Sequence, residues 1–270
     1  MDNRLKELYR ELLLTKFSDG KTVFERIKPD DLCVAGHHVG RLYNKGMLIY
    51  GQAMNGWQNN FFDMDSLIDE IEKSADNHKE LYTMVDYKGW HSEDRKKSYY
   101  YKRSKFWKLN YQVVTNSIDP YFDEFYIKCV SENEREDLLD NAWSQTVAWS
   151  NLYKISFSKG GNPDYSIIDK INEISLKIIL REIEVFKPNK VLFNTGENFF
   201  NNIALSNKNV FDLTKVKGSD NILYVGEYEY STNEKCKMIV CRRPDEVRLH
   251  YKNVDIVKEA REILMAFESI

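Results

Sequence analysis

The sequence predicts a three-layer α/β fold in which a mostly parallel central sheet is flanked by helices. Short apolar runs bounded by turn-forming residues alternate with longer segments of helical periodicity, which is the pattern of strands joined by crossover helices. With 270 residues, of which 42% are hydrophobic, the chain is large enough to bury both faces of a sheet. It contains neither internal repeats nor a linker-like segment, so we expect a single domain over residues 1–270 with an N-terminal helical segment.

Composition excludes several classes of protein. No apolar run approaches the roughly 20 residues that a membrane span needs, and the N-terminus alternates charge with leucine, unlike a secretory signal. We therefore expect a cytoplasmic protein with no membrane partner. The five histidines have no metal-ligand spacing, and His37 and His38 would point apart on a strand. None of the four cysteines belongs to a C-x-x-C pair: Cys33, Cys129, Cys236 and Cys241. We expect reduced thiols, no metal and no cofactor, with an iron–sulfur or zinc site as the alternative.

The first third of the chain is expected to hold two helices and one interior strand. Residues 2–16 space their leucines at helical intervals behind Asp2 or Asn3 as a cap. Residues 17–45 are punctuated by glycine and proline and are expected to be irregular. The apolar run 47–50 is bounded by turn formers and predicts a buried strand. A second helix follows, capped by Asp63 or Asp65, and it turns three residues inward: Leu67, Ile68 and Ile71.

The rest of the chain continues the alternation of strands and helices. The helix predicted over 166–186 carries an isoleucine-rich face and ends before Pro188. Residues 131–141 are acidic and predict a short, solvated helix. The other elements are strands at 146–156, 190–196, 222–230 and 237–241, and helices at 197–205 and about 254–267.

A basic and aromatic segment spans residues 95–108, RKKSYYYKRSKFWK, and is expected to continue as a helix through Tyr111 and Val114. It carries seven cationic residues and no acidic one, although the net charge of the chain is −3. Cations neutralise phosphates and aromatic rings stack on unpaired bases, so this mixture favours nucleic acid as a partner. The candidate DNA-binding residues are Arg95, Lys96, Lys97, Lys102, Arg103 and Lys105. The alternative is an amphipathic helix with a solvated basic face, and both interpretations can hold together.

The segment GMLIYGQAMNGW, residues 46–57, is the most informative stretch of the sequence. Here a buried strand breaks abruptly into glycine and polar side chains, and in open α/β sheets ligands bind where such strands end. Gln52, Asn55 and Trp57 supply amide donors, amide acceptors and an aromatic face, which suit a planar polar ring. The alternative is an ordinary exit turn at Asn55-Gly56.

Two further loop ends accompany this one. Asn151 lies near the exit of the strand at 146–156, where it is either a structural amide or part of a site, and a polar loop follows Cys241. In a parallel sheet the three ends, 51–57, 151–153 and 242–250, would converge on one edge. The chain has no phosphate-binding G-x-x-x-x-G-K-[ST] or G-x-G-x-x-G motif and no G-x-S-x-G elbow, which disfavours nucleotide-cradling enzymes and α/β hydrolases.

The order of these motifs resembles the uracil-DNA glycosylase superfamily from about Gly46 to the C-terminus. The shared order is a G-Q-x-x loop after the first strand, an asparagine ending a middle strand, a K-V-L-F-x-x-G strand, and a last strand ending in a basic loop with proline. The resemblance assigns Gln52 to the catalytic loop, Asn55 to positioning of the hydrolytic water, Trp57 to the wall beside the base and Asn151 to reading of the pyrimidine edge. The family's His-Pro-Ser motif falls on residues 243–245.

The sequence departs from the family pattern at catalytic positions. Ala53 replaces the aspartate of the G-Q-D-P-Y type, the proline of that loop is missing, and Arg243 stands where histidine is expected. Charge on the departing base would then be stabilised by Arg243, with His250 as a second candidate. Phe61 and Phe62, which follow the first loop, are further candidates for contact with the base.

Together these features predict a DNA glycosylase that needs no cofactor and hydrolyses the N-glycosidic bond of a flipped-out, modified pyrimidine, for instance in phage DNA as a defence. Two alternatives remain. One is a catalytically inactive nucleic-acid-binding module on the same fold, and the other is an α/β enzyme that acts on a small metabolite.

Overall fold

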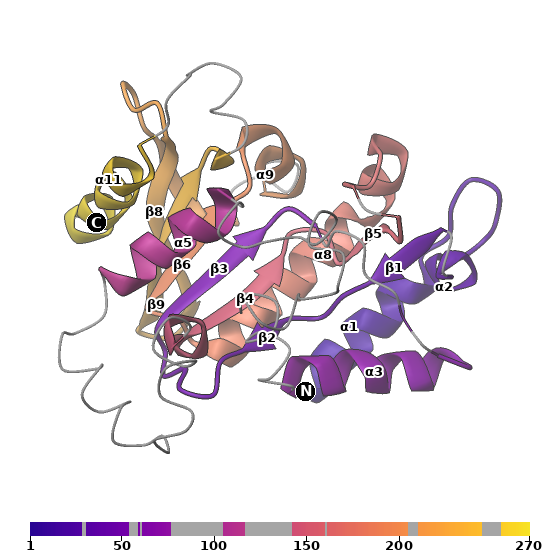
Figure 1. The fold of residues 1–270 in the computed structure, drawn as a ribbon. Coiled ribbons are helices and arrows are strands. Elements are labelled where there is room, and N and C mark those ends of the chain that lie inside the picture. Colours follow the sequence, from indigo (N-terminus) through magenta and orange to yellow (C-terminus); the bar gives the residue numbers. More distant parts are fainter. Residues whose placement is uncertain are drawn as a thin grey trace, which may run out of the picture.

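The protein has a mixed α/β fold (Figure 1). The structure is a computed structural model that describes residues 1–28, 31–53, 59, 61–76, 105–116, 142–159, 161–204, 210–244 and 255–270. Over these residues a seven-stranded sheet has the order β2-β4-β3-β6-β9-β8-β7, and β1 and β5 form a separate two-stranded sheet. The strands are β1 (Leu32–Val34), β2 (His38–Val39), β3 (Met47–Gly51), β4 (Val147–Asn151), β5 (Ile155–Phe157), β6 (Lys190–Asn194), β7 (Asp212–Lys215), β8 (Ile222–Ser231) and β9 (Glu234–Cys241).

The direction of the strands corrects the predicted topology, because the sheet is mixed rather than mostly parallel. The central strands β4, β3, β6 and β9 are parallel to one another, whereas β2 is antiparallel to β4, β8 to β9, and β7 to β8. A tight turn joins β8 to β9, with Asn233 at φ 65°. Such a connection is too short for a crossover and forces antiparallel pairing. Four parallel strands nevertheless end at one edge.

Helices cover both faces of the sheet, so the three-layer arrangement is as predicted. Leu48 and Tyr50 of β3 face the core on the side of α1 (Asn3–Leu14) and α8 (Tyr165–Phe186). The alternate residues Met47 and Ile49 face the core on the side of α5 (Lys105–Thr115) and α11 (Ile256–Ser269). Figure 1 shows α5 and α11 side by side on one face of the sheet.

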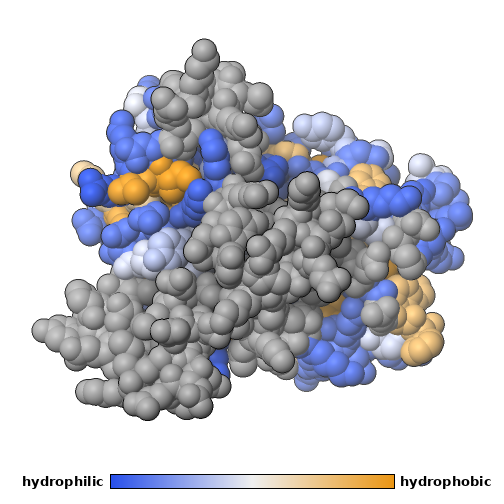
Figure 2. Space-filling view, in the orientation of Figure 1, coloured by the Kyte–Doolittle hydropathy of each residue, from blue (hydrophilic) through white to orange (hydrophobic). Residues whose placement is uncertain are grey.

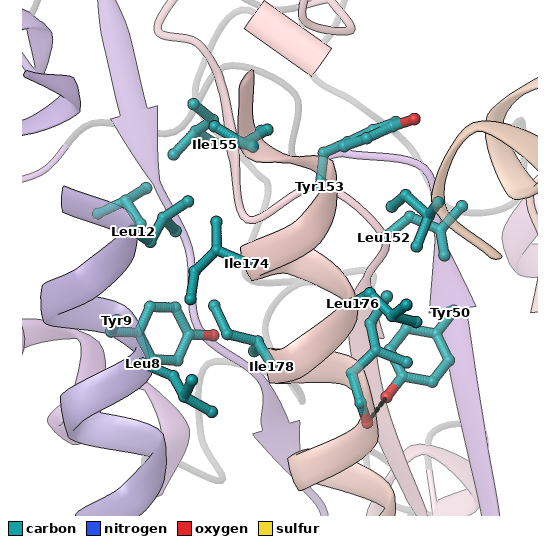
Figure 3. Close-up of a cluster of buried hydrophobic side chains, with 14 of the residues drawn as sticks. Leu8, Tyr9, Leu12, Tyr50, Leu152, Tyr153, Ile155, Ile174, Leu176 and Ile178 are labelled. Atoms are coloured by element: carbon teal, nitrogen blue, oxygen red, sulfur yellow. Dashed lines mark hydrogen bonds between the residues drawn. The ribbon is translucent and has the colours of Figure 1, made fainter. Parts of the chain in front are cut away.

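The long helices begin and end where the sequence predicts. Asp2 caps α1, and its carboxylate also pairs with Arg181 of α8. Asp164 caps α8, which ends at Lys187 in the left-handed conformation, directly before proline. Figure 3 shows how leucines and a tyrosine of α1 pack against α8, where two isoleucines face them: Leu8, Tyr9 and Leu12, with Ile174 and Ile178. The helix α3 (Met64–Asp76) also forms as predicted and buries all three expected residues.

Several short elements differ from the sequence prediction. Residues 17–45 were expected to be irregular but contain β1, β2 and the helix α2 (Val23–Arg26), which Thr22 and Glu25 cap reciprocally. The strand expected over 146–156 is divided into β4 and β5, which belong to different sheets. The edge strand β7 was missed because its side chains are largely exposed and lack an apolar run. The helix α9 (Glu197–Ala204) and the remaining strands match the prediction.

Some predicted features lie outside the described residues, namely the acidic segment 131–141 and residues 95–104 of the basic segment. On the face seen in Figure 2, hydrophilic side chains cover most of the coloured surface and apolar ones form small separate patches. None of the helices that the structure describes is long and apolar enough to cross a membrane.

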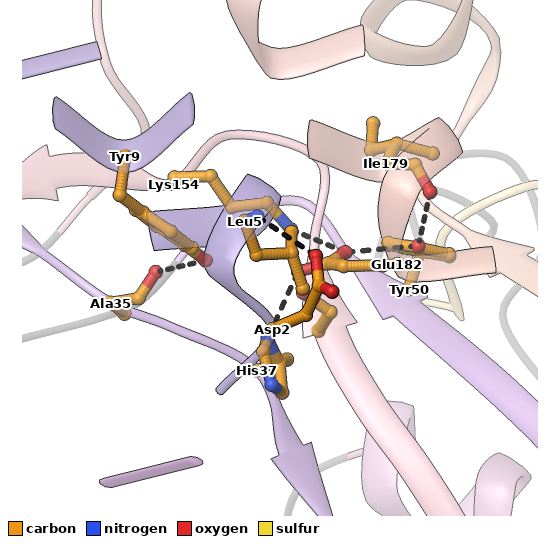
Figure 4. Close-up of polar contacts among 10 residues, drawn as sticks. Asp2, Leu5, Tyr9, Ala35, His37, Tyr50, Lys154, Ile179 and Glu182 are labelled. Carbon is orange, nitrogen blue, oxygen red and sulfur yellow. Dashed lines mark hydrogen bonds and ion pairs between the residues drawn. The ribbon is translucent and has the colours of Figure 1, made fainter. Parts of the chain in front are cut away.

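A buried ion pair joins α8 to the sheet (Figure 4). Lys154 Nζ lies 2.9 and 2.8 Å from the two carboxylate oxygens of Glu182, and both side chains are completely buried. The hydroxyls of Ser150 and Tyr50 each donate to Glu182 at 3.0 Å, and His37 Nδ1 lies 3.5 Å from Oε1. Burial alone would raise the pKa of Glu182, but the Lys154 charge and the hydrogen bonds outweigh it, so the pKa lies below its ordinary value and the carboxylate stays ionised.

We expect Lys154→Met to lower the free energy of unfolding by about 3–5 kcal/mol, because it leaves an uncompensated buried carboxylate. Urea denaturation at neutral pH measures the loss. The control is Lys177→Met in α8, which breaks an exposed ion pair with Glu173 of that helix. It should lower the free energy of unfolding by less than about 0.5 kcal/mol. Equal losses in the two variants would show that the buried pair does not hold α8 to the sheet.

Candidate active site at the carboxyl ends of the parallel strands

The three predicted loop ends meet at one edge of the sheet, as far as they are described. Gly51 at the end of β3 pairs with Asn151 at the end of β4. The backbone amide of Leu152 donates to the carbonyl of Gly51 at 2.9 Å. From the loop after β9, Arg243 Nη1 donates to the side-chain oxygen of Gln52 at 2.7 Å. The convergence inferred from the sequence therefore holds for these residues.

Gln52 connects four loops. Its side chain is buried, its Nε2 donates to the carbonyl of Thr195 after β6 at 2.6 Å, and its Oε1 accepts from Asn162 before α8 at 2.9 Å as well as from Arg243. These bonds use its carbonyl twice and its amide once. The geometry thus gives Gln52 a positioning role in which it orients Arg243, while its predicted catalytic role stays a prediction.

Four residues end the parallel strands in neighbouring positions, and we call them the terminal row: Asn151, Gly51, Asn194 and Cys241. Gly51 is paired with Asn151, and Asn194 with Cys241. The register between β3 and β6, continued by one residue, places Gly51 beside Asn194. By strand alternation the row faces the α5 and α11 side, because Trp149, two residues before Asn151, lies in the core there.

Helix α5 covers the terminal row. Asn110 accepts a hydrogen bond at Oδ1 from Asn194 Nδ2, at 3.4 Å. Phe106, one helical turn earlier, lies over Gly51: a Cβ atom added there would be 3.5 Å from Phe106 Cζ and only 2.8 Å from Asn151 Oδ1. Glycine at this position is what allows the Asn151 amide to lie across the strand end beside the ring.

Several buried polar atoms around the row make no hydrogen bond. Over the described part of the chain these include Asn151 Nδ2, Asn194 Oδ1, Asn110 Nδ2 and Trp149 Nε1, on residues that are at most 5% exposed. Each such group costs about 1–3 kcal/mol when left unpaired in the interior. A cluster of uncharged donors and an acceptor is suited to a planar, uncharged polar ligand, and such a ligand would offset this cost.

A carboxyl group with an altered pKa lies near the row. Glu259 of α11 is 8% exposed, and its Oε2 atom is buried without a hydrogen-bond partner. Burial, reinforced by the charge of Glu262, raises the pKa of Glu259 to about 7, against the opposing effect of Lys105. Burial and then the charge of Glu259 raise the pKa of the Cys241 thiol, which places this carboxyl within electrostatic reach of the terminal row.

The other predicted site residues have varied positions. Phe61 packs on Phe24 with ring centroids 5.5 Å apart, on the α1 side of the sheet and so opposite the terminal row, and Phe62 is fully exposed. Lys105 begins α5, one residue before Phe106. The remaining candidates lie outside the described residues: Asn55, Trp57, His250, Arg95, Lys96, Lys97, Lys102 and Arg103.

Sequence reasoning missed three residues of this site. Asn194 could have been found, because it ends an apolar strand as Asn151 does. Phe106 was noted only as one aromatic residue of the basic segment. Asn110 carries no local signal, since its burial follows from the packing of α5 against β6 and is invisible in a helical pattern.

No known protein-family model matches this chain, and no curated protein matches it. Within the described ranges, no three or more His, Cys, Asp or Glu residues are grouped so that they could hold a metal ion. Cys33, Cys236 and Cys241 are buried, and Cys129 lies outside those ranges.

The pKa of Glu259 predicts a pH-dependent stability. Folding raises this pKa from 4.5 to about 7, so the unfolded chain releases the proton at lower pH than the folded one and stability falls as pH rises between these values. We expect Glu259→Gln to raise the free energy of unfolding at about pH 8 by roughly 1–3 kcal/mol, with little effect at about pH 4. Urea denaturation at several pH values between about 4 and 8 measures this change in the free energy of unfolding. Glu268→Gln, at an exposed position of the same helix, is the control, and parallel profiles for both variants would contradict the assignment.

Proposed function

We propose that this chain is a DNA glycosylase of the uracil-DNA glycosylase superfamily, which hydrolyses the N-glycosidic bond of a flipped-out, modified pyrimidine in the cytoplasm and needs no cofactor. The observation that carries the proposal is the amide nitrogen of Asn151, which is buried beside the ring of Phe106 and has no hydrogen-bond partner among the described residues. It lies at the carboxyl end of β4, where the resemblance requires an asparagine that reads the base.

The residues around Asn151 suit a nucleobase. The amide nitrogen offers donors to a carbonyl or ring nitrogen, Phe106 offers an aromatic face, and Gly51 keeps the strand end flat between them. These groups are buried, so a base could reach them only after leaving the duplex stack. A planar heterocycle with polar edges would pair atoms that otherwise have no partner.

Arg243 supports the chemical step of this proposal. Cleavage leaves negative charge on the departing base, and a permanent cation stabilises that charge without needing a proton. The hydrogen bond that Arg243 donates to Gln52 Oε1 orients the guanidinium at the same edge of the sheet as Asn151. The hydrolytic water is assigned by resemblance to Asn55, and phage DNA as the biological target is likewise an expectation from sequence.

A second candidate function is a DNA-binding module that has lost catalysis. Its specific support is that the Gln52 side chain is already bonded to three loops, together with the replacement of the family's aspartate and histidine by Ala53 and Arg243. This module would bind DNA without releasing any base.

The first functional test uses duplexes that carry uracil, cytosine or their 5-substituted forms at one position, with alkali treatment and a gel to reveal abasic sites. We expect Asn151→Ala to lower kcat/KM by about 10²-fold or more, while Asn116→Ala, at the exposed far end of α5, retains it. Asn55→Ala should bind DNA without turnover. Salt-sensitive binding with no base release from any duplex would favour the binding module instead.

Gly51→Ala tests the geometry beneath Phe106. The new Cβ would lie 2.8 Å from Asn151 Oδ1, so the amide must move and base release should fall by about 10-fold or more. Gly46→Ala, directly before the same strand, is the matched control. Its Cβ would also make a tight contact, 3.1 Å from Thr146 O, but at the opposite end of the strand from Asn151, so base release by the folded protein should be retained. Comparable activity in Gly51→Ala and the wild-type protein would remove Asn151 from the site.

A further inference from the structure

The outer face of α11 carries a short pattern that is symmetric in position and opposite in charge. Residues 261–268 are REILMAFE, so an arginine and a glutamate stand at equal distances on either side of Leu264 and Met265. Arg261 and Glu268 are both exposed, and they lie two helical turns apart on one face of the helix. Met265, between them, is 68% exposed, and Leu264 beside it is half-buried. Figure 1 shows α11 at the outside of the layer that it forms with α5.

The two charges have no partner of opposite sign at helical spacing. Along α11, none of the positions three or four residues from Arg261 is acidic, and none of those from Glu268 is basic. The helix uses this spacing elsewhere, because Lys258 Nζ lies 3.9 Å from Glu262 Oε1. Arg261 and Glu268 therefore cannot pair along their own helix, but they can pair across two helices.

We propose that α11 binds the α11 of a second copy of this chain, antiparallel and about a two-fold axis that passes between Leu264 and Met265. In this arrangement Arg261 of each copy lies opposite Glu268 of the other, so two ion pairs form together. Leu264 and Met265 of the two copies cover one another and leave water. A parallel arrangement would put like charges opposite each other, so the pattern favours the antiparallel one.

Other exposed apolar side chains lack these features. Leu14 at the end of α1 is 55% exposed, but the charges before it already have partners, since Arg10 pairs with Asp65 and Glu11 with Arg4. A single exposed apolar residue is common on monomeric proteins and needs no partner. On α11, by contrast, the apolar pair lies between charges that complement their own copies.

The size of the contact sets the strength that we expect. Helix α11 has 14 residues, and a contact confined to its second half buries less than the roughly 800 Å² per partner of a standard interface. We therefore expect a weak, reversible dimer with a Kd between about 10 μM and 1 mM. Added salt should weaken it, because the ion pairs are exposed. No residue of the candidate site takes part, so the dimer and the glycosylase are tested independently.

Sedimentation velocity of the full-length protein, from about 1 μM to 1 mM, is the test. We expect the average mass to rise with concentration toward twice the 32.0 kDa of one chain. Arg261→Glu and Glu268→Arg each place like charges opposite one another and should raise the Kd about 10-fold or more. An equimolar mixture of these two variants again has opposite charges at both ends, so it should associate as the wild-type protein does. Lys177→Glu, a charge reversal at an exposed position of α8, is the control and should leave the Kd unchanged.

Three results would overturn the proposal. The first is a monomer at every concentration, and the second is a dimer whose Kd neither charge reversal changes. The third is a mixture of the two variants that stays monomeric, because complementary charges would then fail to restore the contact. Circular dichroism verifies that each variant is folded. Because Glu268→Gln is also the control of the pH series, that series is measured at about 1 μM, where the wild-type protein is monomeric.

Discussion

The buried carboxylate of Glu182 is the constraint on which the arrangement of this protein depends. Removing a charge from water costs several kcal/mol unless partners surround it. Here the partners come from separate parts of the chain: Ser150 on β4, Lys154 between β4 and β5, Tyr50 on β3 and His37 before β2. All must be in place together, so the contacts determine where α8 lies on the sheet. They also hold β3 and β4 side by side, and the ends of these two strands form part of the candidate site.

The two faces of these strands treat polar groups differently. On the α8 side every oxygen of Glu182 has a partner, which is typical of a group that stabilises the fold. On the α5 side, amide atoms of Asn110, Asn151 and Asn194 are equally buried but unpaired among the described residues. Unpaired buried atoms also occur on the α8 side, for example Ser175 Oγ. The α5 side differs because three such amides gather at the ends of the strands, and this gathering has the composition of a binding site.

The sequence was sufficient to predict elements that a pattern within one segment encodes. It was not sufficient for features that depend on contacts between distant segments. The isoleucine face of α8 and the apolar run of β3 were readable because periodicity and burial coincide within one segment. The mixed direction of the sheet was not, since strand direction depends on which strands pair. The convergence of Gln52, Asn151 and Arg243 followed from topology, whereas the three partners of the Gln52 side chain depend on loop conformations that no local pattern encodes.

The alternation of side chains along β4 fixes which of its residues face the ion pair and which face the candidate site. Ser150 points to Glu182, while Trp149 and Asn151, on either side of it, point to the opposite face. Gain or loss of a single residue in this strand would exchange the two sets and put an asparagine against the ion pair and a serine in the site. A single inserted or deleted residue that is not accommodated by a β-bulge would therefore disrupt the ion pair and the candidate site together. A substitution at position 151, by contrast, changes the site without moving Ser150.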